Sequence, residues 1–216
     1  MEDMSYILFI CVTAPILSLL FIAKKEMRRG VIFLLIGMFV CLLVSEINGL
    51  LNNLLSVDFF YLTTSVTPIA EELLKSIPVF VFALLISEKL EDMLPIAFFV
   101  GIGFAIMENL ILLTQNFGEV TLFWSLIRGF SSGLMHGICT GMVGICVSFI
   151  RKKKKLFYCG ILAAFDLAIV YHAIFNATVQ ANQIWLNYVG FALPVMTYIS
   201  ILVFLRKNQK QTEPAK

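Results

Sequence analysis

The stretch LPIAFFVGIGFAIMENLILLT, residues 94–114, decides the fold class of this protein. It is long and apolar enough to cross the hydrocarbon core of a bilayer, which takes a helix of about 20 residues. It nevertheless carries a carboxylate and an amide, Glu108 and Asn109, inside the apolar run. An ionisable group at that depth costs roughly 2.5–3.5 kcal/mol on insertion scales, and such residues usually face a protein interior or a water-filled cavity.

Six more stretches have the same length and character. The predicted spans are 5–23, 30–51, 61–87, 94–114, 122–150, 156–180 and 184–205. The composition agrees, because 60% of the 216 residues are hydrophobic and only 14% are charged, whereas about a quarter are charged in a soluble domain. The sequence therefore predicts an all-α, polytopic transmembrane helical bundle of about seven spans. It forms one domain, residues 1–205, followed by a disordered cytoplasmic tail, residues 206–216.

Positive charge gathers in the loops on one side of this arrangement. Four Lys and Arg residues lie in 24–29, one in 88–93, five in 151–155 and four from Arg206 onward. The loops on the opposite side hold none, so the positive-inside rule places the N-terminus outside and the C-terminus in the cytoplasm. We expect a cell membrane location, in a prokaryotic plasma membrane. The run 151–155 is interpreted as a topology signal that also contacts anionic lipid, not as a nucleic-acid site.

Ionisable and amide side chains recur inside four consecutive predicted spans. They are Glu71, Glu72 and Lys75 in the third, Glu108 and Asn109 in the fourth, Arg128 and His136 in the fifth, and His172 and Asn176 in the sixth. A helical rise of about 1.5 Å per residue gives the depth of each group below the outer end of its span. The groups that lie between the outer leaflet and the midplane are Glu72, Lys75, Glu108, Arg128, His136 and His172. Agreement in depth is expected of groups that line one shared cavity. Glu46 and Asp166 are weaker candidates.

Helical spacing separates the members of this set. Adjacent helical residues point about 100° apart, so Glu71 and Glu72 cannot both face one point. One of them is expected to carry out chemistry and the other to orient a neighbour. Lys75 lies three and four residues further on, where it can neutralise one carboxylate. His172 and Asn176 share one helical face.

The fifth span carries two parallel rows of residues at intervals of four. The polar row is Arg128, Ser132, His136 and Thr140, and the small row is Gly129, Gly133, Gly137 and Gly141. Small residues at this spacing let a neighbouring helix approach closely. We expect Gly101 and Gly103 to do the same for the fourth span.

Four motifs in this region resemble, in the same order, those of the PrsW family of intramembrane proteases. They are EELLK at 71–75, GFAIMEN at 103–109, RGFSSGLMHG at 128–137 and HAIFN at 172–176. The related CAAX prenyl endopeptidases usually have Arg where this chain has Lys75, which favours the PrsW branch. The resemblance implies a hydrolase that cleaves a single-span, membrane-anchored protein near the extracytoplasmic face. In PrsW itself the substrate is an anti-sigma factor.

The residues also suggest how such a hydrolysis would proceed. It needs an activated water, a stabilised oxyanion and a proton for the leaving amine. We assign the general base to Glu71 or Glu72, with Glu108 or His136 holding the water. The remaining roles, oxyanion stabilisation and positioning, go to His172 together with Asn176, Asn109, Arg128 and Lys75.

A metal-dependent version stays open at this point. Glu72, Glu108, His136 and His172 would supply enough ligands for Zn²⁺ with an open coordination position. The chain has no HExxH motif, and these ligands come from four separate spans. We therefore favour a mechanism without metal or other cofactor.

Two other classes of function compete with a protease. Intramembrane ionisable groups also mark ion pathways, so the chain could be a proton- or ion-coupled transporter. The small size and the absence of an internal repeat argue against that class. A non-catalytic membrane scaffold with the same fold is the second alternative. The sequence leaves the substrate, the oligomeric state and the organism undetermined.

Overall fold

The chain is described by a computed structural model that places Phe9 and residues 24–116, 118, 120–122, 125, 127–150 and 157–212. Its elements are α2 (Lys25–Leu55), α3 (Phe59–Tyr61), the π-helix η1 (Leu62–Val66), α4 (Thr67–Leu85), α5 (Leu90–Gln115), the π-helix η2 (Ile127–Ser132), α7 (Gly133–Ile150), α8 (Phe157–Val179) and α9 (Ile184–Thr212). The described part of the chain is therefore helical, as predicted. Apart from Phe9, the predicted first span, 5–23, lies outside the described residues.

Five of the described helices are long and apolar enough to cross a membrane. They are Met27–Leu55, Leu90–Gln115, Arg128–Phe149, Tyr158–Val179 and Ile184–Val203. Helix α4 packs among them but carries Glu71, Glu72 and Lys75 within its 19 residues, which lowers its apolar character. The count of seven spans and the predicted orientation stay predictions.

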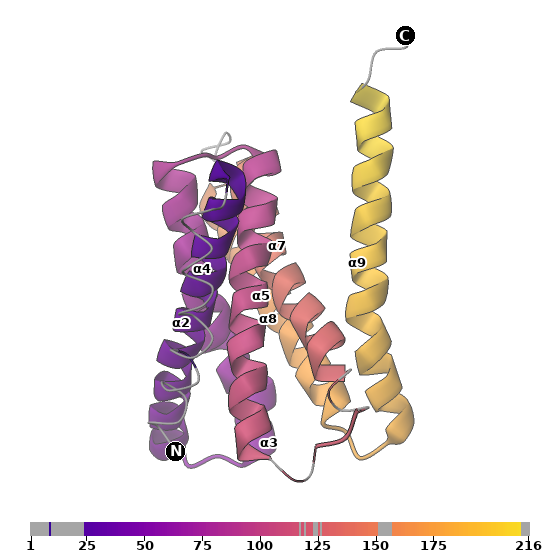
Figure 1. Cartoon of the computed structure of the whole chain (residues 1–216). Coiled ribbons are helices and arrows are strands. Elements are labelled where there is room, and N and C mark those ends of the chain that lie inside the picture. The colour runs from indigo at the N-terminus through magenta and orange to yellow at the C-terminus, as the bar shows by residue number, and fades with distance from the viewer. Residues whose placement is uncertain are drawn as a thin grey trace.

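Short connections make successive helices antiparallel, so their ends alternate between the two ends of the bundle (Figure 1). The turn between α4 and α5 lies at the upper end in this view, as does the C-terminal end of α9. The turn between α8 and α9 lies at the lower end. The predicted orientation depends on this alternation, because it assigns alternate loops to the two sides of the membrane.

Helix α5 packs most extensively against α2 and α7, and glycines make both crossings possible. A Cβ atom on Gly103 would collide with the backbone carbonyl of Leu34 in α2. A Cβ atom on Gly101 would collide with the carbonyl of His136 in α7. The expected role of these two glycines in close helix approach is confirmed.

The predicted glycine row of the fifth span packs only in its second half. Cβ atoms on Gly137 and Gly141 would meet the ring of Phe98 at 2.9 and 2.7 Å. A Cβ atom on Gly133 would only reach Ile102 at 4.0 Å, and one on Gly129 would meet nothing within 4 Å. Gly129 lies in η2, where π-helical winding breaks the spacing of four that an α-helix would keep on one face.

Helix α9 continues beyond the predicted end of the last span. It runs to Thr212, so residues 206–212 are helical where the sequence predicts a disordered tail. Arg, Lys and Gln, which make up most of this stretch, are good helix formers, so the helix can continue past the predicted span. Residues 213–216 lie outside the described part, and the division of the chain at residue 205 stays a prediction.

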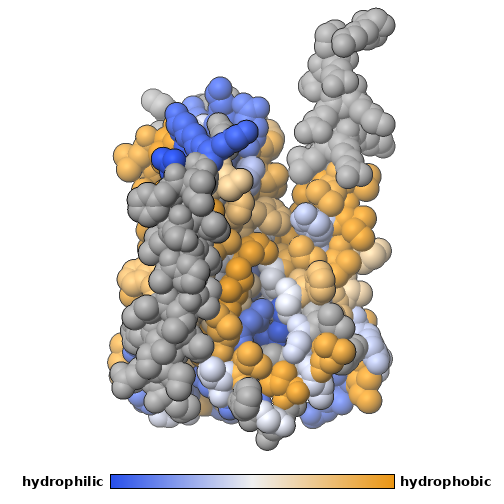
Figure 2. Space-filling view, in the orientation of Figure 1, coloured by the Kyte–Doolittle hydropathy of each residue, from blue (hydrophilic) through white to orange (hydrophobic). Residues whose placement is uncertain are grey.

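The surface of the bundle suits a lipid environment on its flanks. Apolar side chains cover most of the coloured flank, and hydrophilic ones gather at the upper and lower ends (Figure 2). A hydrophilic recess is also visible between apolar walls in the lower half of the molecule.

Candidate functional site

Helix α4 is amphipathic with its polar side turned inward. Glu71, Glu72 and Lys75 are 5%, 1% and 0% exposed. The apolar residues Ile69 and Leu73 of the same helix are about half exposed. A helix in a soluble protein buries the opposite side, so this arrangement fits a helix with lipid outside and a polar interior.

The two π-helices flank the site, and each is held by an asparagine. Asn176 donates from Nδ2 to the carbonyl of Thr63 in η1 at 2.9 Å, and Asn109 donates from Nδ2 to the carbonyl of Arg128 in η2 at 3.0 Å. A π-helix changes the normal pairing of backbone groups, and buried carbonyls need a donor. The Asn176 amide, which the sequence assigned to the oxyanion, makes a structural contact here.

Glu72 receives two hydrogen bonds on one oxygen. Its Oε1 accepts from Lys75 Nζ at 2.6 Å and from His172 Nδ1 at 2.7 Å. A carboxylate only accepts, so His172 carries a proton on Nδ1. Its other nitrogen, Nε2, then points to Glu71, with Oε2 at 3.7 Å.

His136 is contacted at both ring nitrogens. Lys75 Nζ lies 2.7 Å from its Nδ1, and Glu108 Oε2 lies 3.3 Å from its Nε2. An ammonium group has donors and no acceptor, so Nδ1 accepts and the ring proton of a neutral His136 is on Nε2. That tautomer is assigned from the hydrogen-bond network, and it lets His136 donate to Glu108.

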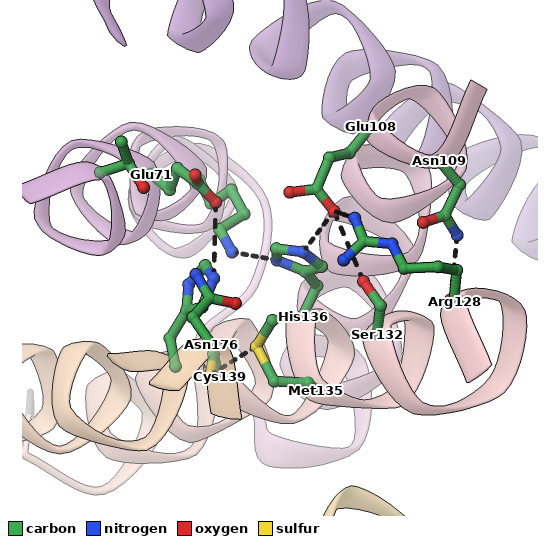
Figure 3. Close-up of polar contacts among 12 residues, drawn as sticks. Glu71, Glu108, Asn109, Arg128, Ser132, Met135, His136, Cys139 and Asn176 are labelled. Atoms are coloured by element: carbon green, nitrogen blue, oxygen red, sulfur yellow. Dashed lines mark hydrogen bonds and ion pairs between the residues drawn. The ribbon is translucent and has the colours of Figure 1, made fainter. Parts of the chain in front are cut away.

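Glu108 is the point where α5, η2 and α7 meet. Figure 3 shows Arg128, Ser132 and His136 converging on it, and its Oε2 lies 2.7, 3.4 and 3.3 Å from their polar atoms. Glu108 is 23% exposed and Arg128 is 16% exposed, so this side of the cluster is the more open one. Ser132 belongs to the predicted polar row but was not predicted as a site residue.

Glu71 differs from Glu72 and Glu108 in its hydrogen bonding. Its Oε2 is buried and has no hydrogen-bond partner among the described residues. A carboxylate oxygen of Glu71 and one ring nitrogen each of His136 and His172 could bind a metal ion, and these three atoms lie within 4.8 Å of one another. The two imidazole rings meet edge to face, with centroids 4.9 Å apart.

The structure brings together nearly all the predicted site residues. The five predicted catalytic residues, Glu71, Glu72, Glu108, His136 and His172, form one cluster with Lys75 and Arg128. Thr140 of the polar row instead donates to the carbonyl of His136. Glu46 and Asp166, the weaker candidates, are both exposed. Sequence reasoning missed the two π-helices, for which TTSVTP at 63–68 and the small residues of RGFSSG at 128–133 were the available signals.

Comparison with known families agrees with this cluster. Residues 26–205 match the family described as PrsW family intramembrane metalloprotease. The chain belongs to the PrsW family. The predicted resemblance is confirmed, and with it a membrane-embedded protease at the level of the family. No curated protein and no solved structure matches this PrsW family chain.

The PrsW family is described as metal-dependent, so the donors of this cluster can be tested for fit. Glu71, His136 and His172 supply one oxygen and two nitrogens at close quarters, and Zn²⁺ is commonly held by this donor set with one position left open. The buried Glu71 oxygen, for which the described residues offer no hydrogen bond, also suits a cation. The donor types fit a metal ion, with Glu71 in place of the Glu72 and Glu108 that the sequence suggested. The ion would have to take the His136 nitrogen that Lys75 contacts.

Proposed function

We propose that this PrsW family protein is an intramembrane endopeptidase in which Glu71 acts as the general base. The observation that carries the proposal is the buried Glu71 oxygen, which has no hydrogen-bond partner in the described part of the chain and lies close to two imidazoles. A water molecule placed there would have a proton acceptor and two polar rings around it. A carboxylate in a poorly solvated site holds a proton more tightly than in water, which suits a general base.

The hydrolysis balances with these groups. Glu71 takes a proton from water while the water oxygen bonds to the scissile carbonyl carbon. The carbonyl oxygen then carries the negative charge of the tetrahedral intermediate, which needs a donor. His172 would supply this donor from Nε2 in the form that carries a proton on both ring nitrogens, with its Nδ1 held by Glu72. When the C–N bond breaks, the proton on Glu71 passes to the leaving amine.

The remaining residues position this pair. Glu72 orients His172, and Lys75 compensates the buried charge of Glu72. Glu108 orients His136 in the same way and is itself held by Arg128. Paired carboxylates and histidines of this kind fix the tautomer and ring orientation of the histidine.

A second candidate mechanism is favoured by the close group of Glu71, His136 and His172. These residues would hold a zinc ion, and Glu71 would then be a ligand and not the base. When bound, zinc would polarise the scissile carbonyl and activate water as a Lewis acid. We place the metal-free version first because both ring nitrogens of His136 already have partners, Lys75 and Glu108.

The substrate that suits this site is a protein anchored in the cell membrane by one span, with an anti-sigma factor as one example. The cluster supports cleavage near the extracytoplasmic face. Glu71 lies near the start of α4 and His136 near the start of α7, whereas Glu108 and His172 lie near the ends of α5 and α8. In antiparallel neighbours these positions share one end of the bundle, opposite the basic residues at the start of α2 and the end of α9.

A cleavage assay in reconstituted membranes tests the proposal. Wild-type protein is expected to cut single-span test substrates, and Glu71→Gln is expected to lower the rate by at least about 10³-fold because the base is lost. Glu91→Gln is the matched control, since Glu91 is exposed in the first turn of α5. Full activity of Glu71→Gln would remove Glu71 from the mechanism.

Chelation separates the two mechanisms. The metal-free version predicts that cleavage survives exhaustive chelation and that the purified active protein contains no metal. Loss of cleavage on chelation, followed by recovery with Zn²⁺, would instead establish the metal-dependent version.

A further inference from the structure

Lys75 is the most enclosed charged group in the described part of the chain. Its side chain is 0% exposed, and its ammonium is surrounded on three sides. Nζ lies 2.6 Å from Glu72 Oε1, 2.7 Å from His136 Nδ1 and 4.7 Å from the centre of the Phe104 ring. A carboxylate, a nitrogen lone pair and an aromatic face are the groups that bind a cation.

The position of this ammonium determines what His136 can offer to a metal ion. Neutral imidazole has one lone pair, and the other nitrogen carries the proton. Lys75 donates to the lone pair on Nδ1, and Nε2 carries the proton that faces Glu108. A metal ion that binds His136 in this tautomer therefore needs the same lone pair that Lys75 occupies.

We propose that Lys75 is a tethered cation that competes with a divalent metal ion for the group of Glu71, His136 and His172. The inference rests on the site assigned under the proposed function and adds the reason for its metal-free chemistry. While Lys75 is in place, the ammonium satisfies His136 and supplies a positive charge to the cluster. A divalent ion must displace it from His136 and tolerate the positive charge nearby.

The charges of the cluster support competition. Three carboxylates, Glu71, Glu72 and Glu108, face two permanent cations, Lys75 and Arg128. Arg128 is already paired with Glu108 at 2.7 Å. Removing the charge of Lys75 would leave Glu72 without its cation and free the lone pair of His136. Both changes strengthen the attraction of the pocket for a divalent ion.

The test measures zinc affinity of the full chain purified in detergent, by competition with a chromophoric chelator. Lys75→Met is one atom shorter than lysine, keeps an unbranched side chain and removes its charge. It is expected to bind Zn²⁺ about 10- to 100-fold more tightly than wild type, the range by which neighbours of metal-binding histidines change affinity. Lys89→Met is the matched control, because Lys89 is exposed at the start of α5, and it is expected to bind as wild type does.

Further variants keep the test decisive. Adding His136→Ala to Lys75→Met is expected to abolish the gain in affinity, because the freed lone pair is removed. Lys75→Gln provides a second neutral variant if Lys75→Met fails to fold, with the same expected gain.

The proposal is overturned if the neutral variants bind zinc no more tightly than wild type, if none of the proteins binds zinc, or if Lys89→Met gains equally. These outcomes are separate from those of the proposed function. A wild-type protein that cleaves nothing would defeat the protease proposal and leave the comparison of zinc affinities intact.

Discussion

Glu71 and Glu72 are neighbours in sequence with different surroundings. Glu72 accepts hydrogen bonds from Lys75 and His172, whereas one oxygen of Glu71 is buried without a hydrogen-bond partner among the described residues. A buried polar group without a partner is costly to the fold, and such groups persist where function requires them. At the scale of single residues, the two adjacent carboxylates therefore have different roles. Glu71 is the reactive one in our proposal, and Glu72 orients His172.

This division predicts that the Glu-to-Gln substitution lowers stability at Glu72 but not at Glu71. Glu72→Gln removes the charge that compensates buried Lys75, and breaking a buried ion pair typically costs about 3–5 kcal/mol. Glu71→Gln breaks no ion pair with a lysine or arginine in the described cluster, so its unfolding free energy is expected to stay within about 1 kcal/mol of wild type or to rise. Thermal and denaturant unfolding in detergent measure both, beside the cleavage assay.

The expected pattern is a stable, inactive Glu71→Gln and an unstable, impaired Glu72→Gln. The reverse order of stabilities would show that Glu72 is the reactive carboxylate and Glu71 the supporting one.

At the scale of elements, the site depends on how closely α5 and α7 cross. Gly101 of α5 lies against the backbone carbonyl of His136, the residue that carries one of the two imidazoles. The two π-helices η1 and η2 lie at the edges of the same site and are held by Asn176 and Asn109. The geometry of the side chains is therefore set by backbone contacts between helices as well as by their own hydrogen bonds.

Gly101→Ala is expected to disturb stability and activity together. The new methyl group would collide with the His136 carbonyl and push α7 away, and overpacking of this kind costs about 1–3 kcal/mol. Gly49→Ala is the matched control, because nothing lies within 4 Å of its added Cβ and Ala favours a helix by up to about 1 kcal/mol. Unfolding in detergent and cleavage rates check both variants, and equal stability of the two would contradict the close crossing.

At the scale of the whole molecule, charge and polarity divide the bundle into two ends. The clustered site residues lie toward one end, and the basic residues at the start of α2 and the end of α9 lie toward the other. A membrane protein sorted by the positive-inside rule has its basic loops in the cytoplasm. The site would then open toward the extracytoplasmic half of the bilayer.

Reporter fusions test this orientation. A fluorescent protein fused to the C-terminus is expected to fluoresce, because it folds in the cytoplasm, and alkaline phosphatase fused there is expected to be inactive. Phosphatase inserted in the loop at 181–183 is expected to be active. Phosphatase activity at the C-terminus would reverse the orientation and place the site on the cytoplasmic side.

The sequence by itself determined that this protein is a helical membrane protein and which residues gather inside it. The length of each apolar stretch identifies the spans. The free-energy cost of ionisable groups in lipid indicates that Glu71, Glu108, His136 and His172 face inward. Both signals can be read from a short stretch of sequence. Only the tertiary structure decided that Lys75 pairs with Glu72, that the same ammonium reaches His136, and that two π-helices border the site. These features depend on the rotation and approach of neighbouring helices, which residues far apart in the chain fix jointly through packing.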